Sequence, residues 1–297
     1  MHTDAHMRLL FALLLALLAC APAAENAQRA GRSTLRVVTW NVHDLFDGID
    51  RTTPPGDSDT VLTQVEVEAK LARVGRVLAR LDADVLVLQE VENLGLLERL
   101  AAGPLAAGGY RAFLREGFDP RGIDVGVLSR VPIADCVSHL EERAPGGSWL
   151  WSRDLLEVHL DIFERPVVLL VNHLVSRLDP SEDGRRLLQA ARVREVADQL
   201  RATAVVLVLG DLNDLPDSVA LRPLLGDGAL ADLGAGLPDG DAWTWSGGGA
   251  RERIDYALLP GEDVTLVTRV EVISGSDITA ASDHRPLLVD LWLGAPG

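Results

Sequence analysis

The chain has 297 residues, of which 47% are hydrophobic, so it can bury a large core as a single domain. Its formal net charge of −16 argues against non-specific binding of nucleic acid through a basic surface. An acidic protein can still act on phosphodiesters when bound cations supply the positive charge that the site needs.

The first 24 residues are typical of a secretory signal. Arg8 precedes an apolar run from Leu9 to Leu18, and small residues follow that run. Because the run is too short to span a membrane, we predict a signal peptide over residues 1–24 and no transmembrane helix in the mature chain. The residues up to Cys20 also resemble a bacterial lipobox, which would anchor the protein through a lipid on Cys20. We favour cleavage and export to the periplasm or the extracellular space over lipidation.

The rest of the chain reads as a short lead-in followed by one domain. Residues 25–34 are predicted to be flexible, and residues 35–297 contain no Gly/Ser- or Pro-rich linker that would divide them. Apolar residues at helical spacing predict helices over 64–81 and 185–201. Apolar segments between turn residues predict strands over 109–114, 123–129, 132–140, 150–162, 254–259 and 264–274. Because several strands follow one another directly, we expect two packed sheets with antiparallel neighbours and helices on the outer faces.

Four tryptophans occur in two alternating pairs. Trp149 and Trp151 form one pair, and Trp243 and Trp245 form the other. This spacing indicates strands with one aromatic face. We expect the rings to pack in the core, since most aromatic side chains are buried. The alternative is a rim that stacks on a base or a lipid.

Five apolar runs adjoin residues that bind hard cations or move protons. Four runs end at these residues and a fifth follows them directly: Asn41, Glu90, His173, Asp211, and the pair Asp283-His284. A helix N-terminal acid or an Asx turn would explain one such residue, but five together predict strand ends gathered into a hydrolytic site. Alternation places Asn213 on the same side as Asp211. No histidine or cysteine spacing typical of zinc is present, so the oxygen-rich set favours Mg²⁺, Mn²⁺ or Ca²⁺.

Seven short motifs follow one another along the chain. They are Thr39-Trp-Asn41, Leu88-Gln-Glu90-Val, Arg121-Gly-Ile-Asp-Val-Gly-Val, Asn172-His173, Gly210-Asp211-Leu-Asn213, Arg253-Ile-Asp255-Tyr and Ser282-Asp283-His284. Each motif is weak alone, but the ordered set resembles the endonuclease/exonuclease/phosphatase (deoxyribonuclease I-like) superfamily over roughly residues 35–293. The resemblance implies an α/β fold, a four-layer α/β/β/α sandwich of two mixed β-sheets with outer helices.

The resemblance also implies which residues would hold a metal and activate water. Asn41, Glu90 and Asp283 would hold the divalent cation, which would be Mg²⁺ or else Mn²⁺ or Ca²⁺. Asp211 would orient or deprotonate the attacking water. Asn213 would hold a non-bridging phosphate oxygen.

Further residues would contact the phosphate or support those that do. His173 would donate to the phosphoryl oxygens, and His284 would act as base or stabiliser, with Asp255 orienting a histidine. A histidine against an anionic phosphate should favour its protonated form. Arg121 would contact the phosphate, and either Glu116 or Asp119 would support a histidine.

These roles together predict an exported, monomeric, divalent-metal-dependent phosphodiester hydrolase, an endonuclease or exonuclease acting on nucleic acid. A phosphatase or a sphingomyelinase-type lipid phosphodiesterase of the same superfamily is the first alternative. A non-catalytic binding module with this fold is the second. The basic residues of phosphoinositide phosphatases do not follow Asn172-His173, and the chain has no long apolar hairpin for membrane entry.

Overall fold

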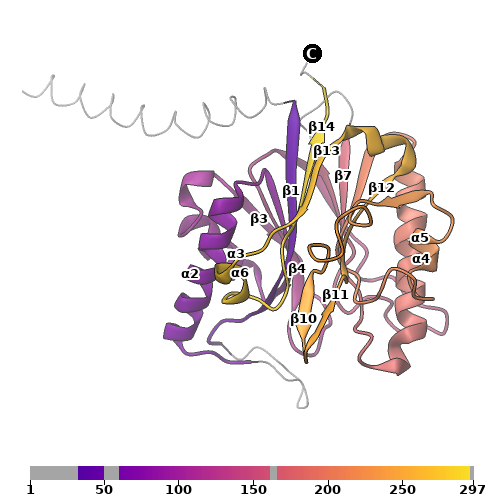
Figure 1. Cartoon of the computed structure of the whole chain (residues 1–297). Coiled ribbons are helices and arrows are strands. Elements are labelled where there is room, and N and C mark those ends of the chain that lie inside the picture. Colours follow the sequence, from indigo (N-terminus) through magenta and orange to yellow (C-terminus); the bar gives the residue numbers. More distant parts are fainter. Residues whose placement is uncertain (1–32, 50–59, 161–165, 295–297) are drawn as a thin grey trace, which may run out of the picture.

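The computed structural model describes residues 33–49, 60–160 and 166–294 (Figure 1). The predicted signal peptide, the lipobox at Cys20 and nearly all of the predicted lead-in lie outside these residues. The first strand begins at Thr34.

The first sheet has six strands in the order β13-β14-β1-β2-β4-β3. Its strands are β1 (Thr34–Leu45), β2 (Val85–Val91), β3 (Arg111–Leu114), β4 (Asp124–Ser129), β13 (Val267–Val272) and β14 (Leu287–Trp292). Only the central pair, β1 and β2, is parallel. All seven residues of β2 are buried, which matches the continuous apolar character expected of a strand covered on both faces.

The second sheet also has six strands, in the order β5-β6-β7-β8-β12-β9. Its strands are β5 (Ile133–Ser138), β6 (Leu156–Leu160), β7 (Val167–His173), β8 (Val205–Asp211), β9 (Leu230–Asp232) and β12 (Asp255–Pro260). Again only the central pair, β7 and β8, is parallel. A separate hairpin pairs β10 (Trp245–Gly247) with β11 (Ala250–Glu252).

Helices cover the outer face of each sheet (Figure 1). The first sheet carries α2 (Gln64–Leu81), α3 (Leu94–Ala102) and α6 (Ser276–Thr279), and the second carries α4 (Asp183–Leu200) and α5 (Arg222–Leu225). Short 3₁₀ turns are η1 (Ala106–Gly108), η2 (Pro180–Glu182) and η3 (Gly261–Leu266). Thr63 and Glu66 form a capping box that starts α2, and its apolar residues face the first sheet. None of the described helices combines the length and the apolar character that crossing a bilayer requires.

Three apolar cores separate these four layers. One lies between α2, α3 and the first sheet, one between the two sheets, and one between the second sheet and α4 with α5. The predicted four-layer α/β/β/α sandwich is therefore confirmed. The helix predicted over 64–81 has those bounds. Of the strand predicted over 150–162, the described residues form a strand over Leu156–Leu160, and residues 161–162 lie outside the described part of the chain. Residues 150–155 are not in the strand, and Arg153 there turns inward to bind backbone carbonyls.

The two central parallel pairs explain why polar residues gather at one edge. Parallel strands end at the same edge of a sheet, so Asn41 lies near Glu90, and His173 pairs with Asp211 in register. Asp255 starts β12 and pairs in register with Asp211 because β12 runs antiparallel to β8. The sheets pack face to face, so both edges open on the same side of the molecule (Figure 1).

Gly210 permits the close contact of β8 with β7 beside this edge. Its φ of +133° lies outside the region that L side chains readily adopt, and a Cβ atom there would lie 1.9 Å from the carbonyl oxygen of Asn172. A glycine is therefore required directly before Asp211.

The tryptophans differ from the expected core packing. Only Trp151 is fully buried, whereas Trp149, Trp243 and Trp245 are half-buried. The expectation is wrong for these three because each ring has a charged partner. Arginines cover Trp149, which also stacks on Phe118, and Trp243, whereas Trp245 donates to Asp283. The guanidinium of Arg143 lies 3.6 Å from the centre of the Trp149 ring, and that of Arg285 lies 3.1 Å from the centre of the Trp243 ring.

Candidate active site

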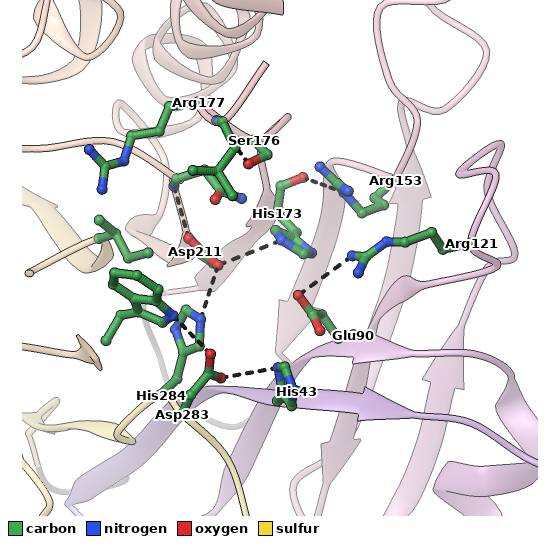
Figure 2. Close-up of a pocket in the computed structure, with 14 residues that line it drawn as sticks. His43, Glu90, Arg121, Arg153, His173, Ser176, Arg177, Asp211, Asp283 and His284 are labelled. Atoms are coloured by element: carbon green, nitrogen blue, oxygen red, sulfur yellow. Dashed lines mark hydrogen bonds and ion pairs between the residues drawn. The ribbon is translucent and has the colours of Figure 1, made fainter. Parts of the chain in front are cut away.

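A pocket of about 420 Å³ opens at the edge where the strand ends gather (Figure 2). Most of its lining residues are polar or charged, and they come from both sheets: His43, Glu90, Arg121, Arg153, His173, Ser176, Arg177, Leu178, Asp211, Asn213, Trp245, Ile254, Asp283 and His284. The structure thus brings together most of the residues that the sequence predicts. Asn41 and Asp255 are buried just behind this lining, in contact with it.

Asn41 connects the two sheets beneath the pocket. Its side-chain Nδ2 donates to Glu90 Oε1 at 3.1 Å and to Asp211 Oδ2 at 3.0 Å. Burial by itself would raise the pKa of Glu90, but the hydrogen bond from Asn41 and the charge of Arg121 outweigh it and hold that pKa below its usual value. Glu90 is therefore ionised at neutral pH.

Asp211 lies between the two predicted catalytic histidines. Its Oδ2 is 3.6 Å from Nε2 of His173 and 3.9 Å from Nε2 of His284. Burial, together with the charge of Asp255, raises the pKa of Asp211 to about 7. A carboxylate whose pKa lies near neutrality is suited to take a proton from water.

The two histidines differ in protonation. Burial would lower the pKa of His284, but its contact with Asp255, 2.8 Å between Nδ1 and Oδ2, outweighs burial and raises the pKa to about 10. Burial and the neighbouring positive charges, Arg153 first among them, hold the pKa of His173 well below its usual value. The protonated form expected for both histidines is therefore supported at His284 and not at His173.

Asp283 and its loop are attached firmly to the first sheet. Ser282 donates from Oγ to the carbonyl of Asn41 at 2.7 Å, and Trp40 donates from Nε1 to the carbonyl of His284 at 3.1 Å. Trp245 Nε1 donates to Asp283 Oδ2 at 2.9 Å. Burial would raise the pKa of Asp283, but its contact with His43 and the charge of His284 lower that pKa to about 2.

The remaining predicted residues lie at different depths. Asn213 lines the pocket, with its Nδ2 bound to the carbonyl of Leu174 at 2.9 Å. Arg121 is half-exposed, and its Nη2 is 3.7 Å from Glu90 Oε1. Glu116 is exposed and does not line the pocket. Asp119, its alternative, binds Nη1 of Arg153 at 2.7 Å, and neither acid contacts a pocket histidine among the described residues.

Several pocket residues have no site role in the sequence interpretation, and three of them contact the predicted site residues. Arg153 is buried and donates to the carbonyls of His173 and Leu174 at 3.1 and 2.7 Å, which fixes the end of β7. Trp245 binds Asp283, and His43 lies 3.1 Å from the same carboxylate. The only local signal is the position of His43, two residues after Asn41.

A two-sheet sandwich with carboxylates, amides and histidines at one edge is the fold of a superfamily of phosphoric ester hydrolases. Residues 38–284 match the Endonuclease/Exonuclease/phosphatase family, and the chain belongs to that family. This confirms the resemblance found in the sequence. No curated protein sequence matches the chain.

Solved structures show the same fold at low sequence identity. Humanized D. rerio TDP2 is 19% identical with a TM-score of 0.63, over 87% of this chain and 99% of the other. The human Nocturnin catalytic domain is 16% identical with a TM-score of 0.64, over 87% and 94%. An endonuclease/exonuclease/phosphatase from Beutenbergia cavernae is 25% identical with a TM-score of 0.59, over 89% and 72%.

Enzymes of this fold use divalent metals, and the donor set at Glu90 fits one. The carboxylates of Asp44 and Glu90 lie close together, and burial with the charge of Glu90 raises the pKa of Asp44 to about 6. Within the described residues no hydrogen-bond donor reaches the buried Oδ1 of Asp44. The nearby cation is Arg121, whose Nη1 is 3.5 Å from that atom, beyond ordinary hydrogen-bond length. Two crowded carboxylates, one of which keeps an oxygen without a donor, suit a divalent cation.

The contact between His284 and Asp255 generates a testable prediction. In metal-free protein, the His284 imidazole should stay protonated from pH 6 to 9, because Asp255 raises its pKa to about 10. In Asp255→Asn the ring should lose its proton within that window, since burial would then dominate. Imidazole ¹⁵N chemical shifts measured against pH check this. Titration of wild-type His284 near pH 6.5, the ordinary value, would contradict the assignment.

Proposed function

We propose that the protein is an exported, divalent-metal-dependent phosphodiesterase, and more specifically a nuclease. The proposal rests mainly on the position of Asp211. This buried carboxylate has a pKa of about 7 and lies between two histidines and opposite Glu90. This arrangement combines a base for water with donors for a phosphate and oxygen ligands for a cation.

In the proposed reaction, Asp211 removes a proton from water as the water oxygen attacks phosphorus. The bond from phosphorus to the leaving-group oxygen breaks, and that oxygen departs with the bonding electrons and takes a proton from solvent. The protonated His284 and the neutral His173 donate hydrogen bonds to the phosphoryl oxygens, where negative charge increases. Asn213 holds a further phosphate oxygen. Glu90, Asp283 and Asn41 would hold the divalent metal, which neutralises phosphate charge when bound.

The arginines of the pocket support a phosphate-containing substrate. Arg121, Arg153 and Arg177 line it beside three acids, although the whole chain has a net charge of −16. Arginines concentrated at one site attract phosphates without making the rest of the surface bind nucleic acid. One similar structure, D. rerio TDP2, is complexed with a single strand DNA product, and by analogy we propose nucleic acid as the substrate here.

Hydrolysis of bis-p-nitrophenyl phosphate tests the reaction. Activity should require Mg²⁺ or Mn²⁺ and disappear in excess EDTA. Asp211→Asn should lower kcat by about 100- to 10,000-fold, the range for losing a general base. Glu116→Gln is the matched control, because Glu116 is exposed and lies outside the pocket lining, and it should keep nearly full activity. Undiminished turnover of the wild type in EDTA, or undiminished turnover by Asp211→Asn, would contradict the proposed mechanism.

A substrate panel then separates the candidates. Single-stranded DNA, plasmid DNA, RNA, sphingomyelin and phosphomonoesters should be compared with the same metal. Faster cleavage of nucleic acid supports the nuclease, and exclusive cleavage of sphingomyelin or of monoesters would replace it with the lipid phosphodiesterase or the phosphatase.

Export is proposed from residues 1–24 alone. Expression of the full chain in a bacterium with an outer membrane should place the protein in the periplasmic or extracellular fraction. Cys20→Ala should leave it there, because cleavage and soluble release are favoured over lipidation. Recovery of the wild type in the membrane fraction, and its loss from that fraction in Cys20→Ala, would show a lipid anchor instead.

A further inference from the structure

His43 lies at the mouth of the pocket but has no role in the proposed reaction. It follows Asn41 by two residues on β1, and its side chain is half-exposed. His43, Asp44 and Glu90 each offer one ligand atom, and these atoms all lie within 4.8 Å of one another. Ligand atoms around one ion at about 2.1 Å lie about 3 to 4 Å apart, so small side-chain rotations would let the three share a cation.

The backbone holds this group in place. His43 and Asp44 both adopt left-handed conformations, with φ of 53° and 58°. Such a pair is costly for residues other than glycine, so surrounding contacts must maintain it. Lys70 donates from Nζ to the carbonyl of His43 at 2.6 Å, and the amide of Asp44 donates to Glu90 Oε2 at 3.0 Å. These contacts present both side chains next to Glu90.

Asp283 orients the His43 ring. Its Oδ1 lies 3.1 Å from Nδ1 of His43 (Figure 2). Its Oδ2 accepts a hydrogen bond from Nε1 of Trp245. Imidazoles that bind metals are commonly oriented by a neighbouring carboxylate. Arg121 is the cation now beside Asp44 and Glu90, at 3.5 and 3.7 Å, so no short ion pair has to break for a metal to approach.

We propose that His43 supplies a nitrogen ligand, together with Asp44 and Glu90, to the divalent metal of this site. This inference rests on the metal dependence of the proposed function. A nitrogen ligand favours Mn²⁺ and later transition metals over Mg²⁺ and Ca²⁺, which prefer oxygen throughout. The site should therefore select Mn²⁺ over Mg²⁺.

Isothermal titration calorimetry on metal-free protein tests the selectivity. The wild type should bind Mn²⁺ at least about 10-fold more tightly than Mg²⁺. His43→Gln should weaken Mn²⁺ binding by about 10- to 100-fold and change Mg²⁺ binding much less. His159→Gln is the matched control, because His159 lies on β6 outside the pocket lining, and it should bind both metals as the wild type does.

Pulsed electron paramagnetic resonance of the Mn²⁺-loaded protein tests the ligand directly. The wild type should show ¹⁴N coupling from a bound imidazole, and His43→Gln should lose it. Coupling and Mn²⁺ affinity that both survive in His43→Gln would overturn the proposal. If His43→Gln does not fold, the wild type alone decides, because equal affinity for Mn²⁺ and Mg²⁺ or an absence of ¹⁴N coupling would overturn it.

These measurements read metal binding rather than turnover, so they separate the two proposals. Mn²⁺ bound through His43 in a protein that cleaves no phosphoric ester would refute the proposed function and leave the metal ligand established. Metal-dependent cleavage with unchanged Mn²⁺ binding in His43→Gln would support the proposed function and refute His43 as a metal ligand.

Discussion

One buried amide holds the two halves of the site together. Asn41 belongs to the first sheet, and its Nδ2 binds Glu90 of that sheet and Asp211 of the second. Asn41 is fully buried, so water cannot replace a lost partner. Removing either carboxylate would therefore leave the buried amide with one hydrogen bond fewer. The parallel pairs bring the four strand ends to one edge, and this amide sets the spacing between the acid on one sheet and the acid on the other.

The same compact arrangement separates the protonation states of similar groups. The pKa of Asp283 is lowered to about 2, whereas that of Asp211 is raised to about 7. His284 beside Asp255 keeps its proton, and His173 beside Arg153 loses it. Neighbouring acids and neighbouring imidazoles with divergent pKa values can divide the roles of base and charge stabiliser, which residue type alone does not assign.

Which parts of the site could be predicted from the sequence depends on how far apart the interacting residues lie along the chain. Asn41, Glu90, His173 and Asp211 were predictable as a group because each comes at the end of an apolar run, which is a local pattern. The roles of Arg153 and Trp245 were not, because their partners lie 20 or more residues away in sequence. The left-handed turn at His43 and Asp44 also has no local signal, since neither residue is glycine. The tryptophans were misassigned because arginines at separate positions in the sequence cover their rings.

The proposed reaction depends on Asp211 as the base that activates water. The pH dependence of kcat/KM for bis-p-nitrophenyl phosphate, from pH 5 to 9 at saturating metal, tests it most directly. Because Asp211 must lose its own proton before it accepts another, kcat/KM should rise with pH and level off, with a midpoint near its pKa of about 7. A value that stays constant down to pH 5, or a rise that persists unchanged in the residual activity of Asp211→Asn, would contradict the account.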